Sequence, residues 1–215
     1  MPAKAPKTPL ALGSNRMITF VKKFPLTHKI SIFASGSGSN ADVLIHHFEK
    51  HPSILVHAIF TNKENAGVVE IAKKHGVRCY YFSNESFASG HEILKTLQNI
   101  ETNYIVLAGF LRKIPMNIIQ AYSHKIINIH PSLLPKHGGK DMYGKRVHEA
   151  VLSQGDSESG ITVHLVNEEY DKGEILAQFS CAVDSSMLID DLAKKIQDLE
   201  HTYYKSTIEK FILHV

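Results

Sequence analysis

Segments that look like β-strands alternate with segments of helical periodicity through residues 30–129 of this chain. Apolar, β-branched runs occur at five places, namely Ile30–Ala34, Ile54–Phe60, Val77–Phe82, Tyr104–Ala108 and Lys125–Ile129. Helix-like spacing of apolar residues falls between these runs, over residues 41–48, 68–75, 92–100 and 115–122. Alternation of this kind with short links predicts an α/β fold, a doubly wound, mostly parallel sheet with right-handed crossovers.

The last third of the chain follows a different pattern. Two further strand-like runs, Ile161–Val166 and Ile175–Val183, are joined by a link too short for a crossover helix, so we expect them to pair antiparallel. A long amphipathic helix then closes the domain, with Leu188, Leu192, Ile196 and Leu199 on its apolar face. The expected fold is therefore Rossmann-like, with antiparallel late strands and a long C-terminal helix.

The charge of the chain is unevenly distributed. The 215 residues carry a net charge of +3, yet six of the 24 basic residues and none of the 21 acidic ones lie within residues 1–29. We therefore expect residues 1–28 to form a basic, poorly ordered extension and residues 29–215 to form a single domain. A targeting peptide, a nucleic-acid-binding arm and a disordered leader all fit the composition of the extension.

Composition also limits the partners and the compartment. The folded part is mildly acidic, which disfavours nucleic acid as the main partner, and no segment approaches the roughly 18 consecutive apolar residues of a transmembrane helix. The two cysteines, Cys79 and Cys181, have no metal-ligand spacing and indicate buried thiols in a reducing compartment. These features favour a cytoplasmic protein.

A glycine-rich turn links the first strand to the first helix. Its residues are Gly36, Ser37, Gly38, Ser39 and Asn40. Glycines let an anion approach the backbone, and free N–H groups at a helix start favour negative charge, so the turn predicts a phosphate monoester site. Together with Ala41 the turn also matches a dinucleotide fingerprint, but the end of the second strand, Phe60-Thr61-Asn62, lacks the ribose-binding acid. A tight turn without a ligand is the remaining alternative.

Two polar residues end the fifth strand-like run. Asn128 and His130 are two positions apart, so in a strand they project to the same face, and Pro131 ends the ladder. An amide donor beside an imidazole suits a reaction in which a carbonyl oxygen becomes negative, although such residues also satisfy ordinary turns. We expect both side chains at a solvent-facing strand tip.

An acidic loop between the two late strands contains Asp171. A loop at a sheet edge can fold over the carboxyl end of a neighbouring strand, where ligands of open α/β sheets bind. If Asp171 lies beside His130, its charge should raise the pKa of the histidine above its usual value of about 6.5. His164, on an alternating strand, is expected to be a packed or rim residue, and none of the 14 histidines shows a zinc spacing.

With these segments in place, the chain resembles the phosphoribosylglycinamide formyltransferase family from about Lys29 to Phe211. The resemblance rests on four motifs: Ser35-Gly36-Ser37-Gly38-Ser39-Asn40, Leu107-Ala108-Gly109-Phe110-Leu111-Arg112, Asn128-Ile129-His130-Pro131-Ser132-Leu133-Leu134-Pro135 and Tyr170-Asp171-Lys172-Gly173. It implies the family's Rossmann-like formyltransferase fold and transfer of a formyl group from 10-formyltetrahydrofolate to the amine of 5'-phosphoribosylglycinamide in purine (IMP) biosynthesis, without a metal.

The resemblance also implies roles for individual residues. The catalytic residues would be Asn128, His130 and Asp171. The ribonucleotide would be bound by Gly36, Ser37, Gly38, Ser39, Asn40, Gln197 and Glu200. The folate would be bound by Leu111, Arg112, Lys113, Ile114 and Asn128.

The chain departs from the family pattern at two places. Some members carry an arginine that touches the folate after the third strand, whereas residues 84–90 here contain no basic residue, and the loop Lys136–Arg146 is longer than the family's shortest form. Alternatives are a sister enzyme, either a methionyl-tRNA formyltransferase or a formyltetrahydrofolate hydrolase, and a dinucleotide-binding module. Each sister enzyme should carry an added domain, for which 215 residues leave no room.

Overall fold

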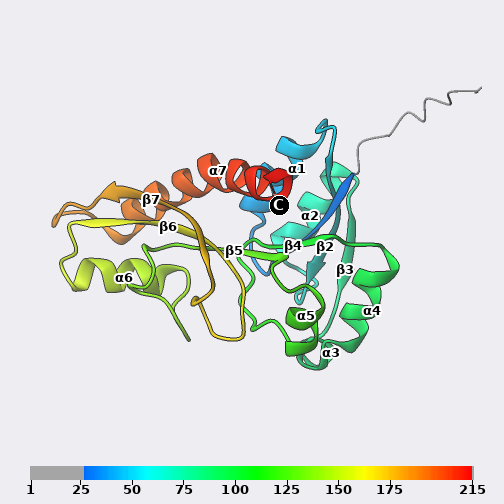
Figure 1. Ribbon diagram of the computed structural model, residues 1–215. Helices are drawn as coiled ribbons and strands as arrows, with labels where there is room; N and C mark the ends of the chain where they lie inside the picture. Colours follow the sequence, from blue (N-terminus) through cyan, green and yellow to red (C-terminus); the bar gives the residue numbers. More distant parts are fainter. Residues whose placement is uncertain (1–26, 215) are drawn as a thin grey trace, which may run out of the picture.

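The computed structural model describes residues 27–214, which form one seven-stranded sheet with helices on both faces (Figure 1). The predicted extension therefore lies outside the described residues, except for Thr27 and His28. The strands are β1 (His28–Phe33), β2 (Ile54–Thr61), β3 (Arg78–Tyr81), β4 (Tyr104–Leu107), β5 (Ile126–His130), β6 (Glu158–Leu165) and β7 (Ile175–Ala182). The first strand begins one residue before the predicted boundary.

The order of the strands is β3-β2-β1-β4-β5-β6-β7, so the chain reverses its direction of growth between β1 and β4. Strands β1 to β5 pair in parallel, while β6 pairs antiparallel with both β5 and β7. The predicted α/β class and the antiparallel late strands are confirmed. In open sheets of this kind, ligands bind outside the carboxyl ends of the strands at the point of reversal, which here is the β1–β4 boundary.

The helices are α1 (Ser39–Phe48), α2 (Gly67–His75), α3 (Asn84–Ser89), α4 (His91–Asn99), α5 (Met116–Ala121), α6 (Lys145–Ser153) and α7 (Ile189–His214). Buried residues of α1, α2, α6 and α7 join the core on one face of the sheet, and those of α3, α4 and α5 join the core on the other. In Figure 1, α7 runs along the top of the view, while α3, α4 and α5 lie together at the lower right. Two covered faces explain why the central strands are continuously apolar.

One helix was not expected, and another begins later than expected. The sequence predicted no helix over residues 84–89, because only Phe87 of this short helix is buried and no apolar periodicity marks it. The Ser83 side chain caps α3 by accepting a hydrogen bond from the Ser86 N–H. Pro115, expected within the first turn of α5, is instead the residue before it.

The long helix α7 holds the ends of β4 and β5 in place. The hydroxyl of Tyr204, a fully buried residue of α7, lies 2.9 Å from the Leu107 carbonyl oxygen and 3.2 Å from that of Ile127. Leu107 is the last residue of β4, and Ile127 directly precedes Asn128, a predicted catalytic residue. Helix α7 therefore holds the carboxyl ends of β4 and β5, where the candidate site lies. Among the described residues, no helix is long and apolar enough to cross a membrane.

A polar cluster inside the sheet predicts a pH dependence of stability. The His57 Nε2 atom lies 3.2 Å from the Ser31 hydroxyl and 3.3 Å from the Thr102 hydroxyl. Burial lowers the pKa of His57 to about 4, and the nearby charges of Lys29 and Arg78 add to the effect. The unfolded chain takes up a proton on this residue near its ordinary pKa, whereas the folded protein does not. The stabilisation is therefore full above that ordinary value and is lost as the pH falls towards 4.

We expect the free energy of unfolding to fall by on the order of 1 kcal/mol from His57 alone between about pH 7 and about pH 5. A His57→Gln variant should lose this part of the pH dependence, whereas His91→Gln, at an exposed position of α4, should keep it. Urea unfolding of the three proteins at both pH values measures the difference. Equal pH dependence in all three would show that His57 does not titrate as its burial requires.

Candidate active site

A cavity of about 1080 Å³ lies at the carboxyl ends of β1, β4 and β5, where the strand order reverses. The predicted site residues that line it are Asn40, Leu111, Arg112, Lys113, Ile114, Asn128, His130, Asp171, Gln197 and Glu200. Ser35 also lines it, whereas Gly36, Ser37, Gly38 and Ser39 are not among its lining residues. One space thus contains the predicted catalytic residues, all the predicted folate contacts and part of the predicted ribonucleotide site.

The last residues of β5 are held in register by β6. Asn128 lies opposite His164, and His130 lies opposite Thr162. The Thr162 hydroxyl accepts a hydrogen bond from the Leu134 N–H at 2.9 Å and donates one to the Ser132 carbonyl at 2.7 Å. The chain that follows β5 is therefore fixed to the neighbouring strand, and both polar side chains face the cavity as predicted.

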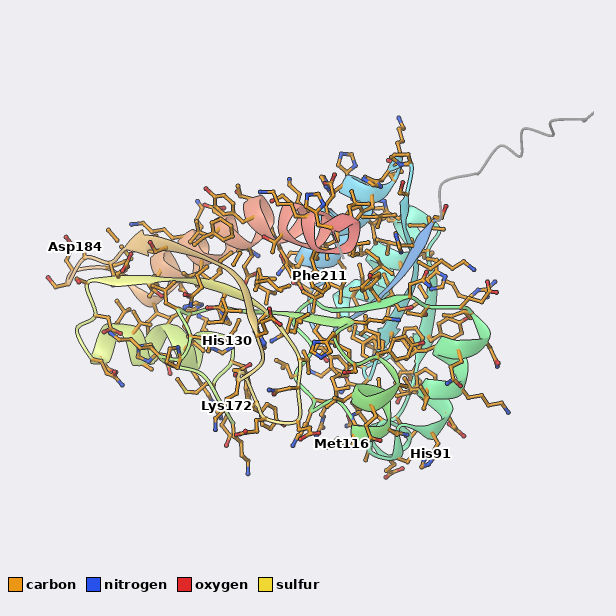
Figure 2. The ribbon with its side chains drawn as sticks, viewed as in Figure 1. His91, Met116, His130, Lys172, Asp184 and Phe211 are labelled. Atoms are coloured by element: carbon orange, nitrogen blue, oxygen red, sulfur yellow. The ribbon has the colours of Figure 1, made fainter. Side chains whose placement is uncertain are left out.

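The ring of His130 is held between a carbonyl and a carboxylate. Its Nε2 lies 2.8 Å from the His137 carbonyl oxygen, so this nitrogen carries a proton, since a carbonyl can only accept. Its Nδ1 lies 3.5 Å from Oδ2 of Asp171. In Figure 2, His130 is near the middle of the molecule, and Lys172, the neighbour of Asp171, is on the loop below it. Nδ1 is thus the nitrogen whose protonation state can change.

Two expectations about His130 are wrong. The residue is only 3% exposed, so it is not at a solvent-facing tip. Burial lowers the pKa of His130 more than Asp171 raises it, and the net shift is downward. The sequence showed the charge partner but not the loss of solvent around the ring. His130 is therefore mostly neutral at neutral pH in the ligand-free protein.

Asp171 is placed by a tight turn of the acidic loop. It has a φ of 54°, and a Cβ at Gly173 would collide with the Leu165 carbonyl oxygen, so the turn requires the glycine. Oδ2 of Asp171 accepts a hydrogen bond from the Gly139 N–H at 2.8 Å. Burial raises the pKa of Asp171, but the contacts with His164, His130 and Gly139 outweigh it and hold that pKa below its usual value. The carboxyl group is therefore charged at neutral pH.

His164 joins this cluster, which the sequence did not predict. It is packed, as expected, at 2% exposure, but its Nε2 lies 3.0 Å from Nδ2 of Asn128 and 3.6 Å from Oδ1 of Asp171. Its Nδ1 lies 2.8 Å from the Leu165 carbonyl oxygen. The contact of His164 with Asn128 follows from the register of β5 and β6, and this register cannot be derived from a single sequence.

The glycine-rich turn is tied to α7. Gly38, with a φ of 84°, precedes the first residue of α1, and the Asn40 amide donates to Glu200 Oε2 at 2.7 Å. The Gln197 amide lies 3.3 Å from the Ser39 hydroxyl. Burial raises the pKa of Glu200, and the hydrogen bond from Asn40 opposes the rise.

The segment Leu111–Ile114 lies between β4 and α5 and forms another wall of the cavity. Leu111 is 48% exposed, and the Lys113 ammonium lies 5.6 Å from the centre of the Tyr170 ring. An exposed apolar residue beside a cation and an aromatic ring suits a ligand that is partly apolar and partly anionic. Within residues 27–214, no group of three or more His, Cys, Asp and Glu side chains could hold a metal ion.

Comparison with known proteins places this fold and site in a family. The model of the formyl transferase family matches residues 28–208, so the chain belongs to the formyl transferases. The names of its relatives define a narrower group within this family. The chain is 38% identical over 191 residues to the chloroplastic phosphoribosylglycinamide formyltransferase of Arabidopsis thaliana, covering 86% of this chain. It spans 65% of that relative's length.

Two bacterial proteins match over nearly their whole length. The phosphoribosylglycinamide formyltransferase of Bacillus subtilis is 34% identical, with 86% of this chain and 94% of the relative covered. The crystal structure of the same enzyme from Brucella melitensis has a TM-score of 0.77 and 34% identity, with 86% and 95% of the two chains covered. The predicted family and its Rossmann-like formyltransferase fold are thereby confirmed.

The electrostatic link between Asp171 and His130 can be tested directly. Asp171→Asn keeps the shape of the side chain and removes the charge that raises the pKa of His130, so that pKa should fall further. Glu168→Gln, which removes an exposed charge from the same loop, should leave it unchanged. An NMR titration of the His130 ring in both variants measures its pKa. Equal pKa values in the two variants would show that the charge of Asp171 does not act on His130.

Proposed function

We propose that this protein transfers a formyl group from 10-formyltetrahydrofolate to the amine of 5'-phosphoribosylglycinamide, a step of purine (IMP) biosynthesis. One observation carries the proposal: a single cavity extends from Asn40, in the first turn of α1, to the cluster of Asn128, His130 and Asp171. A phosphorylated amine could be held at one end while its amine reaches the other. Membership of the formyl transferase family supports the same chemistry.

The reaction needs a hydrogen-bond donor at the formyl oxygen. When the amine attacks the formyl carbon, the carbon–oxygen double bond opens and negative charge develops on the oxygen. Nδ2 of Asn128 has two N–H groups, and the contact at 3.0 Å with His164 occupies one of them. The other is free to donate to the oxyanion, which is the role we assign to Asn128.

The reaction also has to move one proton. The attacking amine loses a proton, and N10 of the folate gains one when its bond to the formyl carbon breaks. Nδ1 of a neutral His130 can accept the first and deliver the second, because Nε2 is already protonated. Asp171 then stabilises the imidazolium that exists between the two steps. The lowered pKa of His130 therefore suits a ring that must begin neutral.

Binding of the two substrates is assigned to different parts of the cavity. Backbone N–H groups of Gly36–Asn40 at the start of α1, together with Gln197 and Glu200, would hold the phosphoribosyl group. Leu111–Ile114 would hold the folate, with Arg112 and Lys113 as the cations available for its carboxylates. Residues 84–90, which follow β3, contain no basic residue, so we assign this task to Arg112 and Lys113.

We further propose that the protein works on small molecules as a monomer or homodimer in the cytoplasm, without a nucleic-acid or membrane partner. The thiols of Cys79 and Cys181 are free in the described structure, which fits a reducing compartment. Fractionation of cells that produce the full chain, followed by light scattering of the purified protein, would test both statements.

The acceptor distinguishes the proposed activity from its alternatives. The purified full chain is incubated with 10-formyltetrahydrofolate and, separately, with 5'-phosphoribosylglycinamide, methionyl-tRNA or water alone. Formyl transfer to the ribonucleotide alone supports the proposal. Transfer to tRNA would instead indicate a methionyl-tRNA formyltransferase, and release of formate in water would indicate a formyltetrahydrofolate hydrolase. Turnover with none of them, together with binding of NAD in calorimetry, would indicate a dinucleotide-binding module.

Substitution of the predicted catalytic residues should lower the turnover number. Asn128→Ala or His130→Ala should lower kcat by on the order of 10² or more, since each removes a group that acts mainly in the transition state. Because His130 is buried, thermal unfolding of each variant must accompany the kinetics. His91→Gln serves as the exposed control. Near-normal kcat in either alanine variant would remove that residue from the mechanism.

The phosphate site is best tested at Gly36. A side chain at Gly38 would lie 2.7 Å from the Val68 backbone at a φ of 84°, so substitution there damages the fold as well as the site. A Cβ at Gly36 meets nothing within 4 Å. Gly36→Val should therefore weaken binding of the ribonucleotide about tenfold or more, with folate binding retained. Titration calorimetry with each ligand decides, and an equal loss for both would indicate general damage.

A further inference from the structure

We propose that His164 is a positioning residue that sets the orientation of the Asn128 amide for formyl transfer. The proposal rests on the function proposed above. It is motivated by the contact of His164 with two of the three predicted catalytic side chains, although it was expected only to pack. The two nitrogens of its ring have different partners, and these partners determine what each nitrogen can do.

The first step concerns the protonation of the His164 ring. Nδ1 lies 2.8 Å from the Leu165 carbonyl oxygen, which can only accept, so Nδ1 carries the proton of the neutral ring. Nε2 therefore presents a lone pair. Its nearest partner is Nδ2 of Asn128 at 3.0 Å, which can only donate. A backbone carbonyl thus determines, through the imidazole, which end of the Asn128 amide faces β6.

The second step concerns what remains available on Asn128. With one N–H donated to His164, the second N–H of Nδ2 is free for the formyl oxygen. If the acceptor on β6 were lost, the amide could rotate by half a turn and present its own oxygen at the same place. Two oxygens would then face each other as negative charge developed on the substrate, and the stabilisation would be lost. The effect should therefore appear in kcat rather than in ground-state binding.

Burial makes His164 suited to this role. The residue is 2% exposed and lies directly opposite Asn128 in the antiparallel β5–β6 pair. Both residues belong to paired strands of the sheet, and this pairing fixes the distance between the two nitrogens. Asp171, 3.6 Å from the same Nε2, is too far for a good hydrogen bond and leaves the amide as the main partner.

Three substitutions separate positioning from packing. His164→Gln can place a carbonyl oxygen near the position of Nε2 and so restore the acceptor for Asn128. His164→Asn can keep a donor for the Leu165 carbonyl but cannot reach Asn128, and His164→Leu removes both. We expect kcat to fall about tenfold in the Asn and Leu variants and only about threefold in the Gln variant. The Kd values of both substrates should change less than about twofold.

A double-mutant cycle tests the route through Asn128. His164→Leu should lower kcat about tenfold in the natural sequence but less than about twofold in an Asn128→Ala background, where no amide remains to be oriented. Losses that multiply in the double variant would overturn the proposal. So would a Gln variant as slow as the Leu variant at equal thermal stability. His91→Gln is the matched control for histidine replacement at an exposed position.

A spectroscopic measurement tests the contact without any activity. NMR of the ¹⁵N-labelled full chain should show His164 protonated on Nδ1 and a coupling across the hydrogen bond between Nδ2 of Asn128 and Nε2 of His164. The coupling should vanish in His164→Asn. Its absence in the natural sequence would overturn the inference even if the protein transfers formyl groups. Its presence in a protein without that activity would refute the proposed function and leave the orientation of the amide established.

Discussion

The antiparallel pairing of β6 with β5 is the constraint on which the candidate site depends. Strands β1 to β5 follow the parallel pattern of a doubly wound sheet, in which the next strand would point the same way. Because β6 instead runs back along β5, it places His164 opposite Asn128 and Thr162 opposite His130. The acidic loop leaves β6 beside the start of β5, where the Val166 N–H donates to the Ile126 carbonyl, and Asp171 in that loop reaches back to His130. A parallel sixth strand would leave its following loop at the carboxyl end of β5, but it would not pair these side chains in this register.

The sequence was sufficient for the fold class because the signals are long and repeated. Five apolar runs separated by helical periodicity predicted the parallel strands to within two residues at each end, and the short link between the late runs predicted their antiparallel pairing. Helix α3 was missed because one buried residue, Phe87, gives no periodicity. The Ser83 cap is a local signal, but without a repeated apolar pattern such a short helix escapes a search for periodicity.

In the candidate site, too, some residues are indicated by local motifs, whereas others depend on contacts between distant parts of the chain. Asn128, His130 and Asp171 were found from local motifs, because a strand end followed by proline and a tight acidic turn are visible in the sequence. The contribution of His164 depends on a pairing between residues 36 positions apart, which no local pattern contains. The direction of the His130 pKa shift depends on how completely the ring is removed from water, which is a property of the packed protein. Motifs thus indicate candidate reacting groups, while packing determines their protonation states.

The electrostatics of the cluster follow from one carboxylate shared by two imidazoles. Oδ2 of Asp171 faces His130 and Oδ1 faces His164, so one carboxylate contacts both rings. Burial leaves the pKa of His130 below its usual value although Asp171 raises it, while the contacts with His164, His130 and Gly139 keep the pKa of Asp171 low. A neutral base beside a permanent negative charge is the state from which a proton can be taken up and then released. If the effect of Asp171 outweighed that of burial, the ring of His130 would be charged. A charged ring could donate a proton but could not first accept one.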